Sequence, residues 1–94
     1  GKSQPNNDHL FFKEIWKKRP HESEVSGTYL GAEALSLYFH HILPKSKYPQ
    51  FRNLDENIIL LTADEHANVE SDIYRYKKVN EIREYLIDKY KLNI

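Results

Sequence analysis

Three of the five histidines of this 94-residue chain fall in one central stretch together with an asparagine. His40 and His41 are adjacent, His41 precedes Asn57 by sixteen residues, and Asn57 precedes His66 by nine. Imidazole is the commonest side-chain ligand of divalent metals and also a general base near neutral pH. A lone histidine on an apolar strand is usually a core or surface residue. This set instead indicates a division of roles, in which one histidine binds a metal ion and its neighbour takes a proton from water.

Local sequence patterns predict the elements that must position these side chains. Residues 35–43, rich in aromatics and ended by Pro44, predict a strand, and the apolar run 57–61 predicts a second one. Residues 44–56 hold two prolines and predict a long ordered loop between them. A helix that begins at Thr62 or Asp64 would carry His66. The order strand, loop, strand, helix predicts an α+β fold built on a small antiparallel hairpin.

A geometric objection applies to the histidine doublet. Successive side chains of a regular strand point to opposite faces, so His40 and His41 should diverge. Both could face one site only if the strand ends or bulges there, and Pro44 makes an ending plausible.

A helix is expected on each side of the hairpin. Asp8 could cap a helix over 9–18, which Arg19-Pro20 would stop. The residues expected on its buried side are Leu10, Phe11, Ile15 and Trp16. From Ile73 onward a long C-terminal helix is predicted by apolar residues at helical spacing, namely Tyr76, Val79, Ile82, Leu86 and Tyr90. The polar residues 1–7 are expected to be a flexible lead-in, and 8–94 a single domain.

Composition excludes several classes of protein. No apolar run approaches the roughly 20 residues of a transmembrane helix. The absence of cysteine excludes a disulfide scaffold and a thiolate zinc site. The 14 basic and 14 acidic residues balance, so the whole chain is not a strongly basic nucleic-acid binder. The first residue is not methionine, and we expect a fragment of a longer chain whose missing part could hold a targeting domain.

The central stretch resembles a known family. FHHILPKSKYP followed by NIILLTADEH is similar to the motif of the HNH endonucleases, which share a ββα-metal fold. The similar stretch runs from about residue 19 to 72, with its motif core at 35–72. The resemblance implies a metal-dependent endonuclease that hydrolyses phosphodiester bonds of DNA, by nicking or double-strand cleavage, and leaves 5′-phosphate and 3′-hydroxyl ends.

The resemblance also implies a role for each motif residue. His40 and His66 would bind one divalent metal ion, and His41 would be the general base that activates water. Asn57 would hold the loop and orient His41 through hydrogen bonds. Some family members have a further ligand where this chain has Glu70, one helical turn after His66.

The ligand set leaves the metal open. A carboxylate at Glu70 favours Mg²⁺ or Mn²⁺, whereas the two histidines would also accept Zn²⁺ or Ni²⁺. Glu70 could equally be a solvated helix residue, and Asn68 and Asp64 are nearby polar alternatives.

This chain departs from the family pattern at the structural zinc that many members hold with two CxxC pairs. The corresponding positions carry Ser23, Ser26, Thr62 and Glu65, which cannot form a tetrathiolate site. We therefore expect no structural zinc, and expect packing around Trp16, Tyr29 and Phe39 to stabilise the domain instead.

Contacts to nucleic acid are expected from the loop between the strands. Lys45, Lys47 and Arg52 are interleaved there with aromatics and could contact phosphates, although ordinary solvated charge is the alternative. DNA is the expected partner, RNA is not excluded by the sequence, and no membrane partner is expected. A cytoplasmic, bacterial or phage-encoded protein is the expected setting. The competing hypotheses are a catalytically silent nucleic-acid-binding module on the same fold and a protein-interaction module that uses its C-terminal tyrosines.

Overall fold

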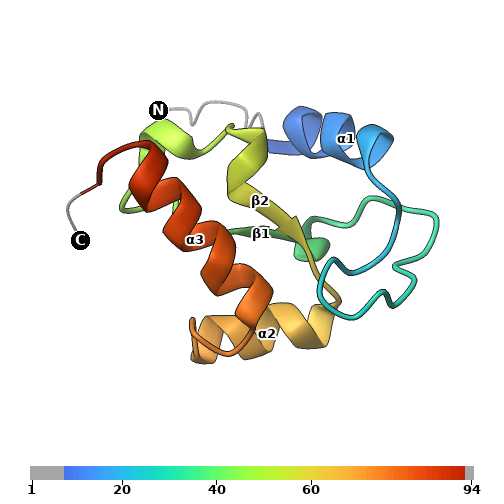
Figure 1. Cartoon of the computed structure of the whole chain (residues 1–94). Helices are drawn as coiled ribbons and strands as arrows, with labels where there is room; N and C mark the ends of the chain where they lie inside the picture. Colours follow the sequence, from blue (N-terminus) through green and yellow to red (C-terminus); the bar gives the residue numbers. More distant parts are fainter. Residues whose placement is uncertain (1–7, 93–94) are drawn as a thin grey trace.

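The computed structural model describes residues 8–92 and has an α+β fold. Its elements are α1 (Asp8–Lys18), β1 (Phe39–His41), β2 (Ile58–Leu60), α2 (Ala63–Ser71) and α3 (Lys77–Lys89), with short 3₁₀ turns at Ser36–Tyr38, Pro49–Phe51 and Asp55–Asn57. The hairpin of β1 and β2 lies at the centre, α1 and α2 lie on either side of it, and α3 runs across it (Figure 1). The predicted lead-in at 1–7 lies outside the described residues.

The predicted hairpin is confirmed, but both strands are shorter than expected. β1 and β2 pair antiparallel with the register Phe39↔Leu60, His40↔Ile59 and His41↔Ile58. The prediction of a strand over 35–43 was wrong at its start, where residues 36–38 form a 3₁₀ turn. A strand forms only where a partner offers backbone hydrogen bonds, and β2 offers three residues.

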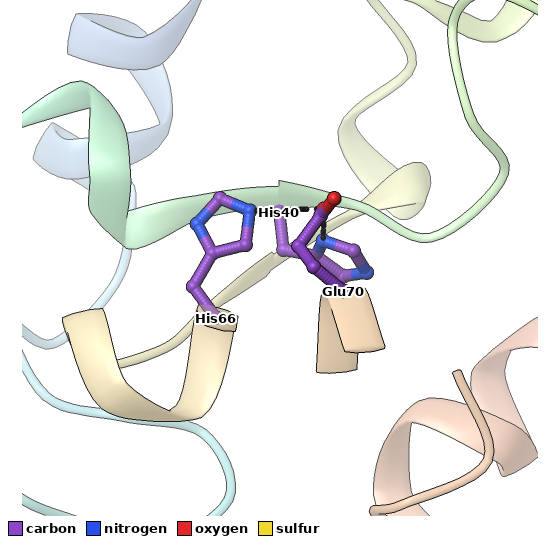
Figure 2. A group of neighbouring side chains, drawn as sticks. All are labelled: His40, His66 and Glu70. Carbon is purple, nitrogen blue, oxygen red and sulfur yellow. Dashed lines mark ion pairs between the residues drawn. The ribbon is translucent and has the colours of Figure 1, made fainter. Parts of the chain in front are cut away.

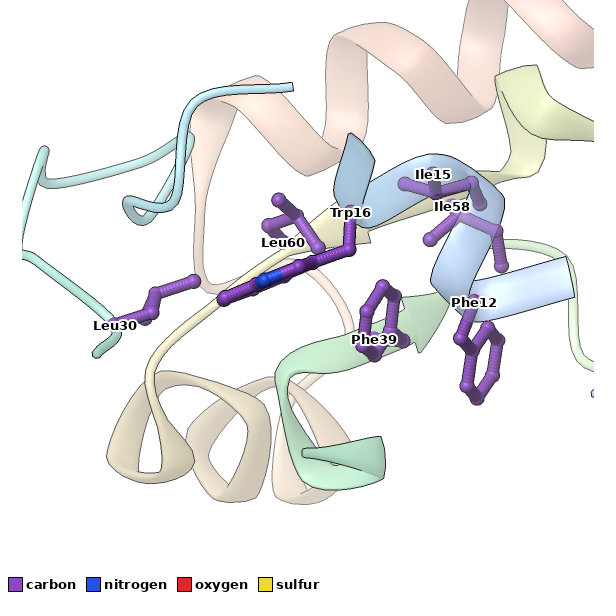
Figure 3. Close-up of a cluster of buried hydrophobic side chains, with 7 residues drawn as sticks. All are labelled: Phe12, Ile15, Trp16, Leu30, Phe39, Ile58 and Leu60. Atoms are coloured by element: carbon purple, nitrogen blue, oxygen red, sulfur yellow. The ribbon is translucent and has the colours of Figure 1, made fainter. Parts of the chain in front are cut away.

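Alternate residues of β2 face different cores, as the two-residue period of a strand requires. Ile58 and Leu60 pack in a cluster with α1, whereas Ile59 and Leu61 pack with Val69 of α2 and with residues of α3. The first cluster consists of Phe12, Ile15, Trp16, Leu30, Phe39, Ile58 and Leu60 (Figure 3). Because both faces of β2 are covered, this strand is apolar throughout.

Helix α1 has the predicted bounds within one residue, but its buried face was partly wrong. Leu10 is 65% exposed, and Phe12 is buried in its place, stacked on Phe39 with ring centroids 4.3 Å apart. Phe12, Ile15 and Trp16 follow the i, i+3, i+4 spacing of one helix face. Leu10 lies off that stripe, so the hairpin cannot cover it.

The two C-terminal helices are separated by a turn that the sequence pattern did not predict. Thr62 caps α2 in a capping box with Glu65, which settles the choice between Thr62 and Asp64. The long helix was predicted to run from Ile73, but α3 begins at Lys77, and Ile73 is 48% exposed in the intervening turn. None of the helices in the described part of the chain is both long and apolar enough to cross a membrane.

Candidate metal centre and general base

The side chains of the histidine doublet diverge, as the geometric objection predicted. β1 is regular through His41, with no bulge, so His40 and His41 point to opposite faces of the hairpin. The His40 ring lies 5.1 Å from that of His66 in α2, whereas the His41 ring lies 5.9 Å from that of Phe12 in α1. Both histidines nevertheless line one cavity of about 1450 Å³.

His40, His66 and Glu70 converge into a group that could hold a metal ion. One ligand atom from each lies within 4.8 Å of the others. Glu70 Oε2 is 3.6 Å from Nδ1 of His40 and 3.4 Å from Nε2 of His66 (Figure 2). The predicted i, i+4 placement of Glu70 beside His66 is confirmed. Two imidazoles and a carboxylate match the ligand types of many divalent-metal sites.

A backbone carbonyl orients His66 for this role. Its Nδ1 lies 2.6 Å from the carbonyl oxygen of Leu37, in the 3₁₀ turn before β1. A carbonyl oxygen only accepts, so Nδ1 donates this bond, and Nε2 is the ring nitrogen that faces Glu70. Such a second hydrogen bond fixes the tautomer of metal-binding histidines.

Burial keeps both histidines of the doublet neutral near pH 7. Burial is the main cause that lowers the pKa of His40 to about 4, and repulsion from Arg83 and from the protonated forms of His66 and His41 adds to it. Burial also lowers the pKa of His41, and the hydrogen bond to a backbone carbonyl offsets part of that effect. A neutral imidazole is the form that can bind a metal ion or accept a proton.

His41 is oriented separately from the metal-binding group. Its Nε2 lies 2.9 Å from the carbonyl oxygen of Arg52, and Nε2 must therefore be the protonated nitrogen. The lone pair is left on Nδ1. This is the tautomer that a general base needs, with one nitrogen anchored and the other able to accept a proton.

Asn57 holds the loop that supplies that carbonyl. Its side chain is fully buried and accepts from the Leu43 amide at 2.7 Å. Its Nδ2 donates to the carbonyls of Leu43 at 3.0 Å and Phe51 at 3.2 Å. None of these bonds, all within the described residues, reaches His41 directly. Asn57 instead fixes residue 51, and residue 52 holds His41.

The predicted phosphate-binding residues of the loop lie along the cavity, but two of them already pair with a carboxylate. Asp8 Oδ2 lies 2.7 Å from Lys45 Nζ, and Asp8 Oδ1 lies 2.8 Å from Arg52 Nε. Burial would raise the pKa of Asp8, but its hydrogen bonds to Arg52 and Lys45 hold it below the ordinary value. Lys47 is exposed and lies 5.7 Å from the ring centroid of Tyr48. The pairing role of Asp8 was missed, because the sequence indicated only a helix cap.

Sequence reasoning also missed a cation on the α3 side of the cavity. Arg83 lines it together with Tyr74 and Asn80. A signal was available, because Arg83 follows the buried Val79 by four residues and precedes the buried Leu86 by three. A charged residue within an apolar stripe is a candidate for a function other than packing.

Ser23, Ser26, Thr62 and Glu65, the positions at which the resemblance to HNH proteins implied zinc ligands, come together around hydrogen bonds. Ser23 Oγ donates to Glu65 Oε1 at 2.6 Å and accepts from the Ser26 amide at 3.0 Å. Glu65 Oε1 also accepts from the Thr62 amide at 2.9 Å, and Thr62 Oγ1 from the Glu65 amide at 3.1 Å. Burial alone would raise the pKa of Glu65, but bonds from these neighbours hold it below its ordinary value. A carboxylate thus joins the turn at 23–26 to the start of α2.

The tyrosines of the alternative protein-interaction hypothesis serve mostly within the fold. Tyr76 and Tyr90 pack against buried clusters, and the Tyr85 hydroxyl donates to Glu56 at 3.0 Å. Tyr74 is exposed beneath the guanidinium of Arg83.

Comparisons of the chain with protein-family models, curated proteins and solved structures gave no match.

Proposed function

We propose that this chain is a metal-dependent endonuclease of the HNH type that hydrolyses phosphodiester bonds of DNA. The observation that carries the proposal is the separation of two histidine environments around one cavity. His40, His66 and Glu70 form a group able to hold a metal ion, and His41 stands outside that group with Nδ1 free of the carbonyl that anchors Nε2.

Each residue has a part in the proposed reaction. His41 Nδ1 takes a proton from the attacking water, while its Nε2–H stays bonded to the Arg52 carbonyl. His40, His66 and Glu70 would hold the divalent ion, which would supply Lewis-acid stabilisation of the scissile phosphate. Asn57 keeps residues 43 and 51 in place, so the anchor of His41 does not move. Neutral His41 suits the task, because a protonated imidazole cannot accept the proton of water.

The anionic ligand makes Mg²⁺ or Mn²⁺ the proposed ion, with Zn²⁺ or Ni²⁺ as substitutes. Three features beyond the histidines support the HNH type: the strand, strand, helix order of the core, the asparagine that closes the loop, and the meeting of the turn at 23–26 with the start of α2. The last is the place where a structural zinc would join the same two segments.

Plasmid nicking tests the proposal directly. Supercoiled plasmid is incubated with the protein and Mg²⁺, Mn²⁺, Ni²⁺ or Zn²⁺, with EDTA as the control. We expect metal-dependent nicking that His41→Ala abolishes while metal affinity, measured by calorimetry, is kept. His66→Ala should lose metal affinity as well as nicking. His21→Ala is the matched control, because His21 stacks on Trp16 away from the cavity and should leave nicking intact.

Two outcomes would contradict the proposal. An inert wild-type protein with every ion at high concentration would favour a catalytically silent binding module. Equal loss of metal affinity in His41→Ala and His66→Ala would show that the two histidines do not divide the roles as proposed.

A further inference from the structure

The cations that line the cavity differ in how far their charge is already neutralised. Lys45 and Arg52 both pair with the buried carboxylate of Asp8, on the α1 side. Arg83 lines the α3 side of the same cavity. Within residues 8–92, no Asp or Glu forms an ion pair with Arg83. Arg83 is therefore the cavity arginine whose charge is not balanced by a bonded carboxylate.

Neutral partners hold the guanidinium of Arg83 in place. Its Nη1 donates to Asn80 Oδ1 at 2.7 Å, and its Nη2 donates to the Ile73 carbonyl at 2.5 Å. The guanidinium carbon lies 5.2 Å from the ring centroid of Tyr74. Asn80 is fixed in turn, because its Nδ2 donates to the Tyr74 carbonyl at 3.0 Å. These bonds use two of the five N–H groups of arginine, so donors remain for a ligand.

The arrangement suits an oxyanion next to the metal group. A guanidinium binds phosphate oxygens through a planar pair of N–H donors, with more geometric control than an ammonium. The turn at 72–76, which interrupts the expected long helix, places Arg83 and its partners at the cavity. The negative charges that line the same side are Glu70, which belongs to the metal group, and Glu84, which is exposed.

We infer that Arg83 contacts a non-bridging oxygen of the scissile phosphate and stabilises the charge that develops on it, an inference that rests on the nuclease function proposed above. α3 then supplies the second half of the site, opposite His41. The loop residues Lys45 and Arg52 would contribute less to phosphate binding, because both are bonded to Asp8, whose single negative charge offsets half of their combined charge.

Arg83→Gln tests the inference, with Arg75→Gln as the matched control. Arg75 lies in the turn at 72–76 that precedes α3, with its guanidinium over the ring of Tyr76, and does not line the cavity. We expect Arg83→Gln to slow nicking on the order of 100-fold, the usual cost of a lost transition-state donor. Metal affinity and urea stability should stay near those of Arg75→Gln. Arg83→Lys keeps the charge without the fork and should be intermediate, and it serves as the test if Arg83→Gln does not fold.

DNA binding is measured separately, so that this inference and the nuclease proposal can fail independently. Fluorescence anisotropy with a short DNA duplex compares His41→Ala with the double variant His41→Ala/Arg83→Gln, neither of which should cut. We expect the double variant to bind more weakly, with the slope of log affinity against log salt lower by about 1. If the double variant binds more weakly but the wild type never nicks, the contact of Arg83 with phosphate is supported and the nuclease proposal is overturned.

A different pattern would overturn the inference and leave the nuclease standing. Suppose that Arg83→Gln nicks plasmid and binds the duplex at wild-type levels, or that Arg83→Lys does so if only that variant folds. Arg83 would then serve only to hold the turn at 72–76 in place. The same conclusion follows if the slower nicking of the Arg83 variant is matched by an equal loss in Arg75→Gln.

Discussion

His41 and His66 present different ring nitrogens because different backbone carbonyls anchor them. His66 and His41 each donate one ring N–H to a carbonyl, which leaves Nε2 available in the first and Nδ1 in the second. His40 is buried on the face of the strand opposite to His41. At the scale of single residues, the carbonyl acceptor at one ring nitrogen therefore decides which nitrogen of His66 and of His41 is left for its proposed role, and for His41 that acceptor lies in the loop held by Asn57.

Asn57→Asp should destabilise the protein by about 3 kcal/mol, judged by urea denaturation at pH 7. The substitution keeps an acceptor for the Leu43 amide but removes the donor to the Leu43 and Phe51 carbonyls and buries a carboxyl. Asn53→Asp, on an exposed turn of the same loop, should stay within about 0.5 kcal/mol of the wild type. Equal stabilities of the two variants would show that the Asn57 side chain does not hold the loop.

At the scale of elements, the turn at 23–26 and the start of α2 are joined by one carboxylate. Gly27, with φ +79°, completes the turn and donates its amide to the Ser23 carbonyl at 2.9 Å. Glu65 serves at the same time as the third residue of the α2 capping box and as the acceptor of Ser23. A single side chain therefore fixes where α2 begins, and hence where His66 stands.

Glu65→Ala should cost about 2–3 kcal/mol of unfolding free energy, because a helix cap is lost and the buried Ser23 hydroxyl loses its acceptor. Thermal and urea unfolding measure the loss. Glu81→Ala is the control, since Glu81 is an exposed helix residue. Its Oε2 lies 4.0 Å from Nζ of Lys77, and such an exposed pair adds little stability. A loss from Glu65→Ala no larger than that from Glu81→Ala would show that this carboxylate does not replace a structural link.

At the scale of the whole molecule, residues 8–92 form three small buried clusters arranged around a hairpin of three-residue strands. A chain of this size buries a modest apolar area, so a ligand that joins two elements changes its stability strongly. The candidate metal group joins β1 to α2 through His40 and His66.

The charged residues are unevenly distributed along the chain. Residues 1–53 hold eight Lys/Arg and five Asp/Glu, whereas residues 54–94 hold six Lys/Arg and nine Asp/Glu.

Metal binding should therefore raise the melting temperature. At a free metal concentration of 100 times Kd, the added stability is about 2.7 kcal/mol, which corresponds to roughly 10–20 °C for a domain of this length. Differential scanning calorimetry with Mn²⁺, and then with excess EDTA, measures the gain and its reversal. His66→Ala should show no gain. If the melting temperature of the wild type stays unchanged with every divalent ion tested, that result would contradict the candidate site.

Local patterns in the sequence predicted the hairpin with its following helix, narrowed the start of that helix to Thr62 or Asp64, and singled out the histidines and glutamate that could hold a metal ion. The i, i+4 spacing alone placed Glu70 beside His66, because a helix repeats every 3.6 residues. The divergence of His40 and His41 followed in the same way from the period of a strand.

Only the tertiary structure decided the features that depend on what packs against what. Phe12 replaced Leu10 in the core because the hairpin covers one stripe of α1, and the strand at 35–43 shrank because β2 offers so few partners. Three further features join residues that are far apart in the chain. They are the pairing of Asp8 with both Lys45 and Arg52, the Arg52 carbonyl that selects the tautomer of His41, and the place of Arg83 in the cavity. Such contacts have no local period, and so the sequence pattern could not reveal them.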